Sequence, residues 1–188
     1  MSDSQDFDYG PLTALIGTWQ GDKGMDIAPE PDGTEESPYF ETLTFTPIGD
    51  VTNAEEQVLV GLRYVQVVSR KSNNKVFHDQ VGYWMWDAAT GTISHSLLIP
   101  RAVGLIAGGA AKTDATTGAV TLEVKAGLHN PDWSIVQQPF MRDKAKTVAF
   151  NAKFTVDGDK LVYSETTVLD IYGRKFQHTD GNTLTRVA

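Results

Sequence analysis

The chain contains four histidines and no cysteine, so histidine is its best-suited side chain for binding a metal ion or exchanging protons near neutral pH. The lack of cysteine excludes disulfides, thiolate zinc sites, iron–sulfur clusters and cysteine nucleophiles. The histidines are His78, His95, His129 and His178. His129 stands beside Asn130 and Pro131 in a predicted loop, which makes it the weakest candidate of the four.

His178 lies in an alternating segment that predicts a strand. Alternation puts Phe176, His178 and Asp180 on one face of that strand and Gln177 on the other. A face shared with a phenylalanine is expected to point inward. A histidine that binds a metal through one ring nitrogen needs an acceptor for its other N–H, and Asp180 or a backbone carbonyl would serve.

His78 and His95 also alternate with apolar residues. His78 shares a predicted face with Trp84, and His95 shares one with Ile93 and Leu97. A histidine on an apolar strand face is more often a hydrogen-bonded core residue than a ligand. For His78, His95 and His178 both interpretations therefore stay open.

Other kinds of catalytic site find little support in the sequence. There is no GxSxG elbow, no phosphate-binding loop ending in GK[ST], no HExxH and no DxD metal loop. The glycine-rich segment from Gly104 to Gly109 lacks a strand, loop and helix context, so it indicates a bend or hairpin. Glu55 and Glu56 stand beside Asn53 in a predicted turn, where water solvates their charge.

The elements that must position these histidines are strands, because period-two runs rich in Val, Thr and aromatic residues recur along the chain. About ten such runs are predicted: Gly17–Asp22, Tyr39–Pro47, Gln57–Ser69, Lys75–Asp87, Gly91–Ile99, Ala102–Ala107, Ala119–Ala126, Lys146–Val156, Lys160–Tyr172 and Lys175–Val187. Tight turns are expected at residues 72–74, 88–91, 108–109, 116–118, 157–159 and 172–174. Because closure removes exposed edges, we predict an all-β, antiparallel up-and-down barrel.

Three segments depart from the strand pattern. Pro11 to Ile16 forms a short apolar stretch that predicts a helical turn before the first strand. Asp26 to Pro38, rich in Pro, Glu and Gly, is expected to be a loop. Gly127 to Asp143 is also expected to be a loop, with room for a short helix.

Length and composition favour a single domain spanning 1–188, with residues 1–9 as a flexible N-terminal arm. The formal charge of −8 is spread along the chain and argues against nucleic acid and anionic lipid as partners. No run approaches the roughly 18 apolar residues of a membrane helix, and the acidic N-terminus is unlike a signal peptide. A cytoplasmic location is therefore expected, and both a monomer and a homodimer stay open.

The segment from Pro11 to Gly21 resembles the opening of the nitrobindin family, whose hallmark is a GxWxGxG motif after a short helix. The motif stands here as Gly17, Trp19 and Gly21, with Lys23 at the third glycine position or that glycine displaced to Gly24. The pattern also has a physical reason, since Leu12, Leu15 and Trp19 can plug one end of a barrel.

The resemblance covers nearly the whole chain in order and spacing. It implies a fatty-acid-binding-protein-like barrel that binds ferric haem b, with His178 as the axial ligand shortly before the Leu184-Thr185-Arg186 ending. His78, before Gly82 and Tyr83, matches a family histidine near the haem, and Phe176 and His95 are further candidates for the pocket.

The implied activity is the handling of nitric oxide or the isomerisation of peroxynitrite to nitrate. The alternative is a lipocalin-like carrier without iron, which takes a fatty acid or another small hydrophobic ligand in the same cavity. A third reading is a barrel filled by its own aromatic side chains, which binds nothing inside.

Overall fold

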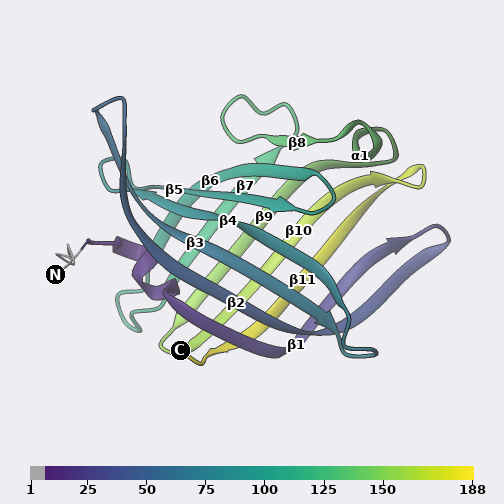
Figure 1. Cartoon of the computed structure of the whole chain (residues 1–188), viewed down its shortest axis with the longest axis horizontal. Helices are drawn as coiled ribbons and strands as arrows, with labels where there is room; N and C mark the ends of the chain where they lie inside the picture. The colour runs from purple at the N-terminus through teal and green to yellow at the C-terminus, as the bar shows by residue number, and fades with distance from the viewer. Residues whose placement is uncertain (1–6) are drawn as a thin grey trace.

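A computed structural model describes residues 7–188, most of which lie in long antiparallel strands (Figure 1). A 3₁₀ helix precedes the strands, and one short α-helix interrupts them. The elements are η1 Gly10–Leu15, β1 Gly17–Glu30, β2 Gly33–Asn53, β3 Gln57–Arg70, β4 Val76–Asp87, β5 Thr92–Ile99, β6 Val103–Thr113, β7 Val120–Gly127, β8 Ile135–Gln137, α1 Pro139–Lys144, β9 Ala145–Asp157, β10 Lys160–Ile171 and β11 Arg174–Arg186.

The strands close into a ten-stranded antiparallel barrel, which confirms the predicted fold class. Neighbours in the chain pair with one another from β1 to β7, then β7 pairs with β9, and β11 returns to β1. The short β8 lies outside this ring order and pairs with the start of β6. None of the helices in residues 7–188 is long and apolar enough to cross a membrane.

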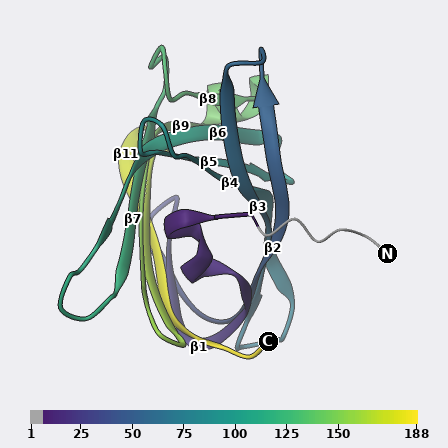
Figure 2. The ribbon, with the colours of Figure 1, turned by 90° about the vertical axis from the view of Figure 1, so that its left-hand side faces the viewer.

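One end of the barrel is plugged by η1, as the apolar turn at Pro11 to Ile16 predicts. Figure 2 looks onto this end and shows η1 inside the ring of strands. Leu12, Leu15 and Trp19 are completely buried, and the Trp19 indole N–H donates to the Leu15 carbonyl at 2.7 Å. The Arg186 guanidinium lies over the Trp19 ring, 4.0 Å from its centroid, and also donates to the carbonyls of Ala14 and Ile16.

All ten predicted strands are present, but two predicted connections are wrong. The expected loop from Asp26 to Pro38 is a hairpin of β1 and β2, which projects beyond the barrel at the end opposite η1 (Figure 1). Most of its side chains are at least partly exposed there, so the hairpin has no need of alternating apolar residues. Its polar composition is therefore similar to that of a loop, which explains the wrong prediction.

The expected turn at Gly108 and Gly109 lies inside β6, and the chain turns instead at residues 114–118. These glycines allow close packing and not a reversal of the chain. A Cβ on Gly108 would overlap the Trp133 ring, and one on Gly109 would overlap the Glu123 carbonyl. The remaining predicted turns, including the one holding Glu55 and Glu56, are confirmed. The expected loop from Gly127 to Asp143 contains the short helix α1, as predicted, and also the three-residue strand β8, which was not predicted.

Part of the expected N-terminal arm, residues 1–6, lies outside the described residues. Residues 7–9 lie against β2, where the Tyr9 hydroxyl accepts a hydrogen bond from the Gly49 N–H at 2.9 Å. Phe7 packs edge-on against the Tyr9 ring.

Candidate functional site

The residues predicted from the last strand lie toward the end of the barrel opposite η1, which we call the open end because η1 plugs the other. Phe176, His178 and Asp180 share the inward face of β11, and His78 lies on the inward face of β4. After the larger effect of burial, the positive charge of a protonated His178 contributes to lowering the pKa of His78. The inward orientation of Phe176, His78 and His178 is the one that alternation predicts.

Asp26 is the residue that sequence reasoning missed, and a β-bulge places it. In β1 the register with β2 shifts between Gly21 and Gly24, so one extra residue is accommodated there. The third glycine of the motif is thus displaced to Gly24, where a Cβ would overlap the Tyr39 ring. Inward-facing positions change from odd to even across the bulge, and Asp26 turns into the barrel in place of Met25.

Asp26 is the hydrogen-bond partner of His178. Its Oδ1 lies 2.6 Å from the His178 Nε2, and the carboxylate is largely buried while the imidazole is 28% exposed. The expectation that Asp180 or a backbone carbonyl accepts this hydrogen bond is wrong, although Asp180 is the Cα partner of Asp26 across β1 and β11. Burial lowers the pKa of His178, but the Asp26 hydrogen bond and the charges of Asp26 and Asp180 outweigh it and raise that pKa.

Three carboxylates form a row across adjacent strands. Asp180 is directly opposite Asp26 on one side and Glu165 of β10 on the other. Burial, reinforced by the charge of Glu165, raises the pKa of Asp180 well above its usual range. Burial and the charge of Glu41 raise the pKa of Glu165 to about 8. Burial and like charges in this row therefore favour the protonated forms of Glu165 and Asp180.

His78 lies beside a second bulge. Val68 pairs with His78 and Ser69 pairs with Val76, so Phe77 is the extra residue in β4. The Phe77 ring packs edge-on against Tyr39 and carries the Arg70 guanidinium 4.3 Å from its centroid. Burial lowers the pKa of His78, and the hydrogen bond to Gln80 partly opposes that shift.

A buried polar layer separates this open end from the aromatic core. Both carboxylate oxygens of Glu41 accept hydrogen bonds, Oε1 from Gln66 at 2.8 Å and Oε2 from Tyr163 at 2.9 Å and Asn182 at 2.8 Å. The Tyr163 hydroxyl also lies 2.9 Å from that of Tyr39. Because each group in this layer has partners, the layer fixes the lumen side chains in one arrangement.

The structure does not place His95 with the other two histidines. It is fully buried, stacks on Trp84 with ring centroids 4.1 Å apart, and bonds the Tyr64 hydroxyl through Nε2 at 2.9 Å. Burial lowers its pKa to about 3, so the ring is neutral in the folded protein. These contacts are those of a core residue, and we leave His95 out of the site proposed below.

The buried His95 predicts a pH-dependent loss of stability. In the unfolded chain it takes up a proton as the pH falls through 6.5, whereas in the folded protein it does so only near 3. Stability is thus lost as the pH falls across this window. We expect His95→Phe to remove that loss, so the wild type should lose on the order of 4 kcal/mol more than the variant between pH 6.5 and pH 3.

Urea unfolding monitored by tryptophan fluorescence across this pH range measures the difference. Glu165 titrates in both proteins, so its effect on the free energy of unfolding cancels in the comparison. His129→Asn is the matched control, because His129 is exposed and should leave the pH dependence unchanged. Parallel stability curves for wild type and His95→Phe would contradict the prediction.

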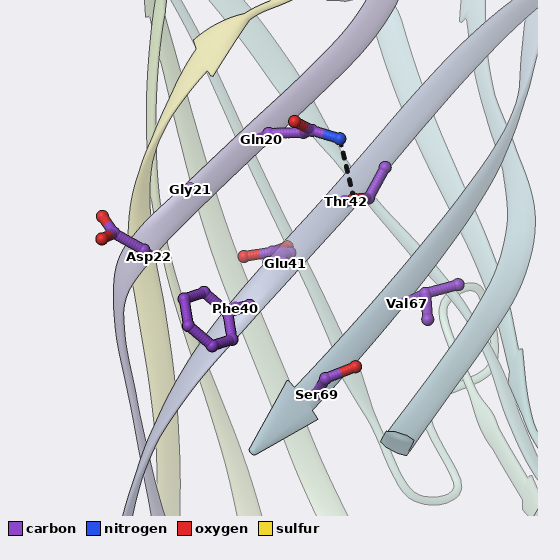
Figure 3. A pocket seen from close by; sticks show the side chains of 8 residues that line it. All are labelled: Gln20, Gly21, Asp22, Phe40, Glu41, Thr42, Val67 and Ser69. Carbon is purple, nitrogen blue, oxygen red and sulfur yellow. Dashed lines mark hydrogen bonds between the residues drawn. The ribbon is translucent and has the colours of Figure 1, made fainter. Parts of the chain in front are cut away.

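A separate groove of 420 Å³ lies on the barrel wall over β1, β2 and β3 (Figure 3). Its lining contains none of the predicted site residues and consists of Gln20, Gly21, Asp22, Phe40, Glu41, Thr42, Val67 and Ser69. Most of these side chains face outward, with the Gln20 amide donating to the Thr42 hydroxyl at 3.4 Å. The groove is thus distinct from the open end that carries His178.

Residues 8–186 match the family model described as the THAP4-like, heme-binding beta-barrel domain. Since this match spans nearly the whole chain, the protein belongs to that family of haem-binding β-barrels, and the resemblance to nitrobindins is confirmed at family level. The fold is similar to that of the crystal structure of Rv2717c from M. tuberculosis, with a TM-score of 0.68 and 21% identity over 96% of this chain and 100% of that chain. No curated protein matches the chain by sequence.

Proposed function

We propose that this protein binds haem b at the open end of the barrel, with the His178 imidazole as the axial iron ligand. The observation that carries the proposal is the Asp26–His178 hydrogen bond inside a haem-binding family fold. An axial histidine uses one ring nitrogen for iron and keeps its orientation through the other. Asp26 supplies that second contact at Nε2, which leaves Nδ1 as the ring nitrogen for the iron.

The surrounding residues fit a porphyrin in chemical character. Phe176 shares the inward face of β11 with His178 and provides an apolar surface for a flat macrocycle. His78 lies on the inward face of β4 and can donate or accept a hydrogen bond in the same lumen. We assign Phe176 and His78 to the pocket wall and His178 alone to the iron.

Bound ferric haem supplies an iron at which nitric oxide or peroxynitrite reacts, and we propose the isomerisation of peroxynitrite to nitrate as the activity. The part played by this chain is electrostatic and positional. The Asp26 carboxylate is hydrogen-bonded to the His178 imidazole and holds its orientation. The barrel wall covers one side of the site and limits the access of water.

The acidic side chains in the lumen argue against the alternative function, a fatty-acid carrier. A fatty acid would bring its own carboxylate toward Asp26, Glu41, Glu165 and Asp180, and burial already raises the pKa of three of these groups. A further negative charge there is unfavourable. An uncharged apolar ligand would not meet this obstacle, so the test must include one.

Titration of the purified wild-type protein with hemin tests the proposal. We expect a Soret band of the histidine-ligated type that saturates at one hemin per chain. Stopped-flow mixing of the loaded protein with peroxynitrite should then give faster decay to nitrate than the haem-free protein gives. Absence of a Soret shift at equimolar hemin, together with displaceable binding of a fluorescent apolar probe, would favour the carrier. Haem binding without faster decay of peroxynitrite would refute the proposed isomerase activity and leave the proposed haem site standing.

A further inference from the structure

We propose that Asp26, His178 and Asp180 form a binding site for a first-row divalent metal ion, with Zn²⁺ as the favoured ion. The ligand atoms of these residues all lie within 4.8 Å of one another. Two adjacent strands hold them, because Asp26 and Asp180 are directly opposed across β1 and β11, and His178 precedes Asp180 by two residues on the same face. This inference does not depend on haem binding.

A second observation, on the neighbouring strand, also favours a cation at this place. Glu165 lies directly opposite Asp180 on β10, is 7% exposed, and its Oε1 has no hydrogen-bond partner among residues 7–188. A buried carboxylate oxygen without a partner is costly, and like charges opposed across strands destabilise a sheet. A divalent ion among Asp26, Asp180 and His178 would offset most of the negative charge of the row and place a positive charge near Glu165.

The donor set selects the class of metal. Imidazole nitrogen and carboxylate oxygen are both zinc ligands, and a set of three residues leaves the fourth tetrahedral position for water. Ca²⁺ and Mg²⁺ prefer six or more oxygen ligands, so a set containing an imidazole disfavours them. The site is half-buried at the open end, where an ion reaches it from solvent.

The test is isothermal titration of the full chain with Zn²⁺ after treatment with a chelator. We expect one Zn²⁺ per chain, no heat from Ca²⁺, and a rise in melting temperature with Zn²⁺. Asp26→Asn and Asp180→Asn should each weaken Zn²⁺ binding by about 10- to 100-fold, because each keeps the side-chain shape and removes the charge. Co²⁺ should bind the same site and give a visible absorption spectrum that these variants lose.

The matched control is Asp22→Asn, on the same strand as Asp26 but with a side chain that is 65% exposed. It should bind Zn²⁺ like the wild type. Circular dichroism checks that every variant is folded, and His178→Ala provides a second test if one Asn variant fails to fold. Equal Zn²⁺ affinities in the wild type, Asp26→Asn and Asp180→Asn would overturn the inference, as would the absence of stoichiometric binding.

Competition with hemin separates this inference from the proposed function. Since both ligands need His178, loading with Zn²⁺ should slow the appearance of the Soret band, and a chelator should restore the rate. If hemin binds but Zn²⁺ does not, the metal site is refuted and the haem site stands. If Zn²⁺ binds in an Asp26-dependent manner and hemin does not bind, the metal site stands and the haem site is refuted.

Discussion

Trp19→Ala is expected to lower the free energy of unfolding by about 3 to 5 kcal/mol, the range typical of large buried aromatic residues. The indole is fully buried and donates its N–H to the Leu15 carbonyl, so the substitution removes packing and a hydrogen bond together. It also removes the surface on which the Arg186 guanidinium rests, 4.0 Å from the ring centroid. Urea unfolding monitored by far-ultraviolet circular dichroism measures the loss.

Trp19→Phe separates the two contributions. It keeps most of the apolar surface but cannot donate to Leu15, so its cost should be well below that of Trp19→Ala. Tyr172→Ala, in an exposed turn, should change stability by no more than about 0.5 kcal/mol. A Trp19→Ala variant that unfolds at the wild-type urea concentration would show that η1 is not held by this side chain.

The barrel itself could be predicted from the sequence because its strands alternate and its turns carry suitable residues. Buried and exposed faces along β5 and β10 follow the period of two, and the turns at residues 157–159 and 172–174 lie where the turn residues are. The β1–β2 hairpin was missed because it projects past the barrel rim, where water solvates most of its side chains. Gly108 and Gly109 were misassigned because a glycine needed for close packing looks the same in sequence as one needed for a turn.

The site was only partly predictable, because a β-bulge in β1 changes which residues of that strand face inward. His178 and Phe176 follow from simple alternation in β11, which runs without a bulge beside β10. Asp26 does not, because a bulge between Gly21 and Gly24 reverses which residues of β1 face inward. The displaced glycine of the GxWxGxG motif was the available signal, since an inserted residue in a paired strand requires a bulge.

His95 shows a second limit of prediction from alternation, which indicates whether a side chain points inward but not where it lies along the barrel axis. Its strand face is apolar, and alternation placed it inside the barrel correctly. Alternation says nothing about depth, however, and His95 lies against Trp84 and Tyr64 deep in the core. Distinguishing a core histidine from one at the open end requires knowing which end of the strand η1 closes.

His178→Ala is expected to abolish the histidine-type Soret spectrum of the hemin-loaded protein, because the variant lacks the proposed iron ligand. His78→Ala should shift the band without removing haem, since His78 belongs to the pocket wall. Asp26→Asn should keep the histidine-type spectrum but weaken retention of haem by about 10-fold or more, because the ring loses a charged acceptor. Absorption spectra at equal protein and hemin concentrations, followed by transfer of haem to apomyoglobin, measure both effects.

Residual haem in His178→Ala does not bear on the identity of the iron ligand, because an apolar cavity can hold a porphyrin without an iron bond. The criterion is the ligand-specific spectrum. Imidazole added to His178→Ala should restore that spectrum if the variant only lacks the iron ligand, which separates loss of the ligand from loss of the fold. If His178→Ala kept the wild-type spectrum while a folded His95→Phe lost it, the haem would be bound from the core side and the site at the open end would be wrong.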